Sequence, residues 1–256
     1  MKEIRSLLNS MVVCAVALAM VSTLAAQTVN QGAAKVVRLK GSARYSTGNN
    51  VWEQLKVGDV VKPGTVIQTA GNKSSVDFVL GDGSAPVARP VAEGMLSYQP
   101  TAEQNLVRMW ENTLLSFDKL TFTETGADVV TETQLDLKAG HIFGMVKKMS
   151  AASKYEVKIP NGVAGIRGTT YDISAEGLIK VLAGSVVLAY VGPDGTVVTQ
   201  VIMGLQQFDA RTGVLTQLSD LDKRGMGVLV KQLPVVFTPM PTPLSADKTL
   251  KFVSPH

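Results

Sequence analysis

The segment Pro160–Asp172 reads PNGVAGIRGTTYD and carries three glycines at a spacing of three residues. A phosphate-binding loop requires a lysine followed by serine or threonine after its last glycine, but Thr169 follows Gly168 directly. A dinucleotide-binding fingerprint requires a helix after the glycines, whereas the residues after Gly168 are typical of a strand. The pattern therefore predicts a turn, a bulge or a close approach of two backbones. We expect the Arg167 guanidinium to bond nearby carbonyl or carboxylate oxygens and to clip adjacent strands together.

Short runs rich in Val, Ile, Thr, Leu and aromatic residues recur along the chain, and most of them end at Gly, Pro, Asp or Asn. They predict strands at 34–39, 41–45, 60–61, 66–69, 76–80, 106–110, 114–117, 120–125, 134–138, 141–146, 155–159, 163–173, 178–182, 185–191, 197–203 and 206–209. Residues 104–115 also show helical spacing, so a helix there is an alternative.

Many short strands with glycine turns predict an all-β domain over residues 34–218, with residues 101–133 as an insertion. The strands recur at a nearly constant spacing, which is typical of a β-solenoid in which coils stack on one another. A β-sandwich is the alternative architecture, because the repeat is not clean in residue identity. Both architectures would carry turns and exposed loops on a β framework.

The two ends of the chain differ from this pattern. Residues 1–27 begin with positive charge, continue in an apolar run from Met11 to Val21 and finish in small residues, which predicts a secretory signal peptide cut near Ala26 or Gln27. Ser219 is expected to cap a short helix over residues 219–233. Four prolines then predict an extended tail over residues 234–256.

Composition excludes several classes of function. The single cysteine, Cys14, lies inside the expected signal peptide, so we expect a mature chain without disulfides or thiolate metal sites. The formal net charge is +4, but basic residues are interspersed with acidic ones, which argues against nucleic acid as a partner. His141 lies in an apolar strand and is expected to be packed rather than catalytic. No serine lies in a Gly-x-Ser-x-Gly elbow, and the sequence predicts no catalytic residue, cofactor or metal site.

Two segments resemble the FecR domain family. The stretch IPNGVAGIRGTTYDIS followed by GLIKVLAGSVVLAY is similar to the core of that domain, and WEQLKVGDVVKPGTVIQTAGNKSSVDFVLGDGS is similar to its start. LDLKAGHIFGMV resembles its central strand. The resemblance implies an all-β FecR-type domain whose matching positions shape the backbone and perform no chemistry. The positions that we single out are Gly58, Asp59, Pro63, Gly64, Gly165, Arg167, Gly168 and Thr169.

FecR-type regulators relay iron–siderophore signals to a cytoplasmic sigma factor through an N-terminal cytoplasmic segment. Only ten residues precede the apolar run that starts at Met11, so the chain resembles the periplasmic portion without the relay. The sequence therefore predicts a secreted, non-enzymatic domain of the bacterial envelope, periplasmic or extracellular, without a stable membrane span after signal cleavage. It would act through contacts with an envelope protein as a sensor accessory or scaffold. The alternative is a cell-surface glycan-binding module that uses Trp52, Trp110 and Tyr98 as stacking rings.

Overall fold

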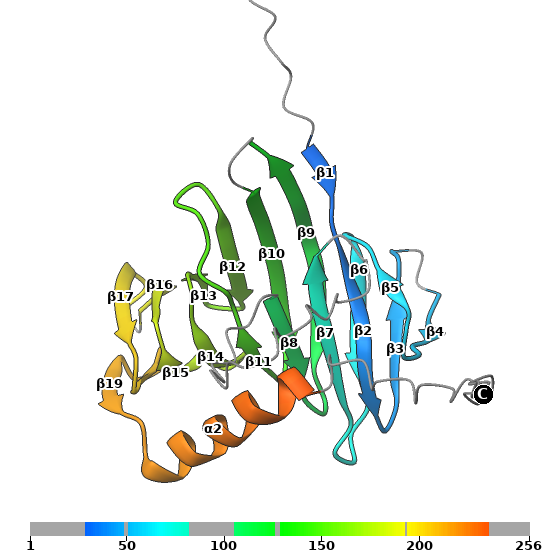
Figure 1. Cartoon of the computed structure of the whole chain (residues 1–256). Coiled ribbons are helices and arrows are strands. Elements are labelled where there is room, and N and C mark those ends of the chain that lie inside the picture. Colours follow the sequence, from blue (N-terminus) through cyan, green and yellow to red (C-terminus); the bar gives the residue numbers. More distant parts are fainter. Residues whose placement is uncertain (1–28, 49–50, 82–104, 126–128, 193, 236–256) are drawn as a thin grey trace, which may run out of the picture.

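The computed structural model describes residues 29–48, 51–81, 105–125, 129–192 and 194–235. These residues form an all-β structure of two sheets with one helix, as expected from the sequence (Figure 1). The predicted signal peptide, Tyr98 and most of the predicted tail lie outside the described residues.

Sheet A contains ten strands. Along the sheet they are β17 (Val197–Met203), β16 (Ser185–Val191), β13 (Gly162–Ile166), β12 (Lys154–Ile159), β10 (Val129–Ala139), β9 (Leu114–Glu124), β6 (Thr65–Thr69), β3 (Ala43–Ser46) and β4 (Glu53–Gln54). The tenth strand, β1 (Val29–Gln31), pairs with the C-terminal part of β9, at residues 121–123.

Sheet B contains nine strands and lies against sheet A. Its order is β19 (Val214–Gln217), β18 (Gln206–Asp209), β15 (Leu178–Ala183), β14 (Thr170–Ser174), β11 (His141–Met145), β8 (Asn105–Met109), β7 (Ser75–Gly81), β2 (Ala33–Lys40) and β5 (Val60–Val61). Residues 105–115 form strands and a turn, so the helical alternative for this segment is wrong.

The chain passes repeatedly from one sheet to the other through short bends. Pairs such as β10 and β11, β13 and β14, or β15 and β16 continue each other across the two layers. Neighbouring strands are antiparallel, except that β12 runs parallel to β10 among the described pairings. A β-solenoid stacks successive coils with parallel pairing, so the architecture is the sandwich of the two predicted alternatives.

Buried threonine hydroxyls link bends to their neighbours, as Thr69 Oγ1 does by accepting from the Thr113 N–H at 2.9 Å and donating to the Thr113 carbonyl at 3.3 Å. Two further bends of this kind follow a glycine. Thr113 Oγ1 accepts a hydrogen bond from the His141 N–H (3.2 Å) and lies 3.1 Å from the His141 carbonyl oxygen, to which it donates. Thr169 Oγ1 does the same with Ser185, accepting from its N–H at 3.2 Å and donating to its carbonyl at 2.8 Å. In these two bends one side chain thus bonds both main-chain groups of the first residue of the strand that follows the bend.

Glycine precedes the bonded residue in each of these bends. Gly140 and Gly184 have φ values of +75° and +85°, a conformation that side chains rarely adopt. A Cβ at Gly140 would lie 2.6 Å from the Thr113 Cα, and one at Gly184 would lie 2.4 Å from the Gly168 carbonyl oxygen. A third bend is similar, because Gly41 (φ +72°) precedes Ser42, whose N–H donates to the buried Ser74 hydroxyl. Both the backbone conformation and the space therefore require glycine.

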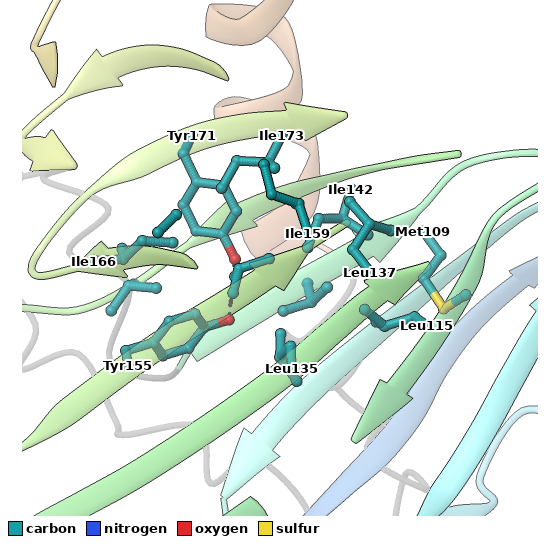
Figure 2. Close-up of a cluster of buried hydrophobic side chains, with 14 of the residues drawn as sticks. Met109, Leu115, Leu135, Leu137, Ile142, Tyr155, Ile159, Ile166, Tyr171 and Ile173 are labelled. Atoms are coloured by element: carbon teal, nitrogen blue, oxygen red, sulfur yellow. Dashed lines mark hydrogen bonds between the residues drawn. The ribbon is translucent and has the colours of Figure 1, made fainter. Parts of the chain in front are cut away.

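Rings from opposite sheets pack in pairs through the core. Phe78 of sheet B lies edge-on to Phe117 of sheet A, with centroids 5.1 Å apart, and Tyr190 contacts Phe208 in the same way at 5.2 Å. Figure 2 shows the central part of the core, where the Tyr155 and Tyr171 hydroxyls are hydrogen bonded at 3.1 Å. Burial raises the pKa of both tyrosines far above the usual value, so these hydroxyls stay protonated.

The helix α2 (Asp220–Val235) covers the face of sheet B that points away from sheet A (Figure 1). Its Met226 and Leu233 pack with Leu106, Phe143 and Met145 in a second hydrophobic cluster. The predicted cap is confirmed, because the Ser219 hydroxyl accepts a hydrogen bond from the Asp222 N–H at 3.1 Å. The helix continues two residues past the predicted end at Leu233.

An ion pair fixes the first turn of α2 to the sheet. Lys180 Nζ of β15 lies 2.6 Å from Asp222 Oδ1, and this pair, with the Ser219 hydroxyl, lowers the pKa of Asp222. Asp172 lies opposite Lys180 in the register of β14 and β15. Burial raises the pKa of Asp172 to about 6, against the attraction of Lys180. The two carboxylates near one lysine therefore shift in opposite directions.

Thr113→Val is expected to lower the free energy of unfolding by about 1 to 3 kcal/mol, because it leaves the His141 N–H without its acceptor and removes one of two donors to the His141 carbonyl, the other being the Trp110 N–H. Denaturation in urea measures the loss. Thr199→Val is the matched control, since Thr199 is exposed on β17 and its replacement should change stability little. Equal effects of the two substitutions would show that the bend does not depend on the hydroxyl.

Asp172→Asn is expected to make the protein more stable at pH 7 than the parent by on the order of 1 kcal/mol, and equally stable near pH 4. A carboxyl whose pKa rises on folding, here from 3.8 to about 6, contributes stability at low pH that is lost as the pH rises through that interval. Urea denaturation at both pH values tests this. Asp118→Asn, at an exposed position of β9, is the control. A gain that is the same at both pH values would contradict the assignment.

Candidate functional site

The motif positions that the sequence singled out lie in bends and turns at separate places in the sandwich. Gly168 (φ +63°) and Thr169 form the bend between β13 and β14, and Gly165 lies within β13 opposite Val187. Thr169 provides the fastening hydroxyl described above. None of these residues lines either of two cavities, of about 470 and 380 Å³, in the described part of the chain.

The upstream positions shape two turns. The Asp59 N–H donates to the Lys56 carbonyl at 3.2 Å, with Gly58 (φ +96°) before it, and the Asp59 carboxylate accepts from the Lys56 N–H at 2.8 Å. Pro63 and Gly64 (φ +87°) occupy the two central positions of the next turn, which is the arrangement of a type II turn. Their role as a shared family signature stays a prediction.

The expected clip by Arg167 is not formed among the described residues. Its side chain is exposed, and the structure shows no hydrogen bond or ion pair from its guanidinium to them. The alternation along β13 explains this: Ala164 and Ile166 face the core, so the next residue points to solvent. The contact between strands comes instead from Thr169, two residues later.

The two tryptophans proposed for glycan stacking do not share a platform. Trp52 precedes β4 of sheet A, is 38% exposed and has the Arg44 guanidinium 4.6 Å above its ring. Trp110 follows β8 of sheet B and stacks on His141 with centroids 5.6 Å apart. His141 is thus packed and hydrogen bonded through its main chain. Its pKa is lowered mainly by burial and, to a smaller extent, by the positive charge of the nearby Lys180.

A large uncharged surface lies where sheet A ends at β17. We call it the valine face; its members are exposed and point away from sheet B: Val163, Val187, Ala189, Val191, Val197, Val201 and Met203. The register places Val187 opposite Val201 and Val191 opposite Val197, so their side chains are neighbours. Val197 is 77% exposed. Contiguous apolar area of this kind on a sheet is typical of an interaction site.

The two ends of the sandwich are protected differently. At one end the sheets finish in β4 and β5, which have two residues each (Figure 1). At the other end β17 has seven residues and β19 has four, and neither contains a charged residue or proline. Natural sheets protect their edges with short strands, charges or proline, because an open edge pairs with other chains. The β17 end has none of these features and is the better candidate for binding.

Charged residues lie beside the valine face but not within it. Lys158 of β12 lies opposite Val163 of the neighbouring β13, and Glu156 lies opposite Gly165. Strands β13, β16 and β17 contain no ionisable residue on the exposed face. The surface is therefore suited to an uncharged, extended partner.

Reasoning from the sequence did not identify this surface. The signal was present in SVVLAYV and VVTQVIM, where apolar residues occupy both alternating sets of positions. In an antiparallel sheet with one face in water, polar residues are expected at every second position. Apolar residues on both faces of these strands depart from that pattern and mark the outer face as unusual for a sheet in contact with water.

The described residues contain neither a membrane-spanning helix nor a cluster of metal ligands. They include no helix that is both long enough and apolar enough to cross a bilayer. In the same residues, no three His, Cys, Asp or Glu side chains come together as potential metal ligands.

Comparison with known proteins places part of this chain in a family context. The model of the FecR family, described as FecR protein, matches residues 100–187, and this confirms the resemblance expected from the sequence. The match spans β8 to β16 and includes the bends at Gly140, Thr169 and Gly184, whereas the upstream motif around Gly58 and Gly64 lies outside it. No curated protein sequence matches the chain.

Among solved structures, two crystal structures of a proposed anti-sigma factor from Parabacteroides distasonis are similar over part of the chain. Each has 14% sequence identity and a TM-score of 0.33, and the alignment covers 45% of this chain. The chain spans about half the length of these proteins, 51% in each case.

Arg167→Ala and Arg167→Lys are each expected to change the free energy of unfolding by less than about 0.5 kcal/mol, as is usual for exposed side chains without a partner. Thermal unfolding beside Thr169→Val gives the comparison, since the threonine variant should melt clearly lower. A large loss with Arg167→Ala that Arg167→Lys does not restore would show that the guanidinium does clip the strands.

Proposed function

We propose that this chain, in which residues 100–187 are of the FecR type, is a secreted non-enzymatic domain of the bacterial envelope that acts through protein contacts. It serves as a sensor accessory or scaffold and binds its partner along β17. The observation that carries the proposal is the valine face beside an open, uncharged edge strand. The predicted signal peptide supports the location.

Strand addition is the mode of binding that fits this surface. An extended peptide adds to an open sheet edge through main-chain hydrogen bonds, and its alternate side chains contact the face beside it. β17 pairs with β16 on one side only in the described structure. A partner strand with apolar residues at every second position would cover Val201 and Met203 and continue sheet A.

The framework is rigid enough to present such an edge. Val186, Leu188 and Ile202 on the inner side of the same strands are fully buried, so the exposed valines are held in place by the core. Because the pleat alternates strictly, burying one set of side chains fixes the direction of the other. A rigid edge reduces the ordering cost of binding.

A second candidate is binding of a glycan at Trp52. A cavity of about 470 Å³ is lined by polar side chains that include Gln54, Gln68 and Arg44, and the Arg44 guanidinium also lies over the Trp52 ring. Arg44 also donates to Gln68 Oε1 at 2.7 Å, which holds the guanidinium over the ring. Binding on a glycan array that is lost in Trp52→Ala and retained in Trp110→Ala would favour this function over strand addition.

Photocrosslinking tests the proposed protein contact. A photoreactive amino acid at Val201, in protein recovered from the envelope fraction, is expected to give a discrete adduct with one envelope protein. Lys158 is the matched control, because it is exposed on the same sheet but outside the valine face. Val187→Lys should abolish the adduct without lowering the melting temperature, since Val187 is 46% exposed.

The outcomes separate the alternatives. An adduct from Val201 alone, and lost with Val187→Lys, supports strand addition at β17. Equal adducts from Val201 and Lys158 would show that contacts are nonspecific, and recovery of the protein with an intact leader in the cytoplasm would contradict the location.

A further inference from the structure

A second cavity, of about 380 Å³, lies on sheet B beside the last turns of α2. Strands β2, β7 and β8 form its floor, and Leu229 and Gln232 of the helix form part of its wall. Trp110 and His141 give it a flat aromatic side, with their rings inclined by 26°. A volume in this range holds a small molecule.

The charged side chains at this cavity are mostly cations. Arg38, Lys40 and Lys73 line it and are exposed, and within the described residues none of them forms an ion pair. Arg108 also lines it but is buried and neutralised by Asp77, with contacts of 2.6 and 2.7 Å. The one carboxylate in the lining, that of Glu111, accepts a hydrogen bond from the Lys73 N–H. Three cations therefore face one carboxylate, and the cavity attracts anions.

Five side chains of the lining can only donate hydrogen bonds: Arg38, Lys40, Lys73, Arg108 and Trp110. Trp110 Nε1 is buried and finds no acceptor among the residues that the structure describes. An indole N–H can only donate, as can ammonium and guanidinium groups. Buried donors without a partner are rare, and such a group requires an explanation such as a ligand.

His141 adds an uncharged surface to this site. Burial, and after it the nearby Lys180, lower the pKa of its imidazole, so the ring is neutral at neutral pH. The Trp110 ring packs between this imidazole and the Arg108 guanidinium, which lies 5.4 Å from the indole centroid. The indole is thus held in a fixed orientation at the cavity wall.

We propose that this cavity binds a phosphate or sulfate group, to which Arg38, Lys40 and Lys73 supply charge and the Trp110 N–H supplies a directed hydrogen bond. Most oxygens of such an oxyanion are hydrogen-bond acceptors, which matches the side chains of the lining that can only donate. The ligand is either a small phosphorylated or sulfated molecule or the headgroup of an anionic lipid. The proposal does not depend on strand addition at β17, because the cavity lies on the other sheet.

The chain contains a convenient reporter. It has two tryptophans, so Trp52→Phe leaves Trp110 as the only source of indole fluorescence. Titration of this variant with inorganic phosphate, and separately with sulfate, is expected to change the fluorescence in a saturable manner, and added sodium chloride should weaken the binding. Isothermal titration calorimetry of the unmodified chain measures the same affinity without the reporter.

Matched charge variants locate the site. Arg38→Gln combined with Lys40→Gln is expected to weaken phosphate binding by about tenfold. Lys147→Gln combined with Lys148→Gln removes the same charge at exposed positions outside the cavity lining and should leave the affinity unchanged. Arg108 is left intact because its pair with Asp77 is buried, and removing one partner would destabilise the fold.

Vesicles distinguish the two sources of the ligand. Binding of free phosphate with no sedimentation on phosphatidylglycerol vesicles supports a small-molecule ligand. Sedimentation that is lost with the Arg38 and Lys40 variant supports a lipid headgroup. Absence of both a saturable signal and vesicle binding would overturn the proposal, as would equal losses in the two charge variants.

Discussion

The sandwich depends on how its strands cross from one sheet to the other. At a crossing the main chain leaves one hydrogen-bonded ladder before it joins the next, and its polar groups are buried between the layers. A threonine hydroxyl solves this at two places by bonding both main-chain groups of the residue opposite, and glycine before that residue supplies the positive φ and the space.

The core is a consequence of these bends. Each long hairpin bends near its middle, so that one half lies in sheet A and the other half lies in sheet B. The inner faces of the two halves then pack against each other. The ring pairs Phe78 with Phe117, and Tyr190 with Phe208, then meet from opposite layers. A change at a bend therefore affects packing at both ends of the hairpin, which explains why the buried threonines matter more than the exposed Arg167.

Strand positions were predictable because apolar runs and glycine turns are local signals. The bend at Thr169 was located from its glycines, and the FecR resemblance was recognised from the same residues. The partner of that bend was not predictable, because Ser185 lies sixteen residues away and hydroxyl contacts leave no period in the sequence. The clip expected from Arg167 is not seen among the described residues, because the alternation along β13 directs this side chain to solvent, which the glycine spacing alone did not indicate. The valine face and the cavity beside Trp110 arise from strands distant in sequence and were not predicted.

The single parallel pairing among the described strands, between β10 and β12, divides the sandwich into two consecutive parts. In sheet A the strands up to β10 lie on one side of this pairing and the strands from β12 onward lie on the other. In sheet B the boundary between β11 and β14 divides the strands in the same way. A chain that folds in the order of its sequence can therefore complete its first part and use the free sides of β10 and β11 as a template for the second, which ends at β17 and β19. A partner strand added there would continue, from another molecule, the process by which the domain assembles itself.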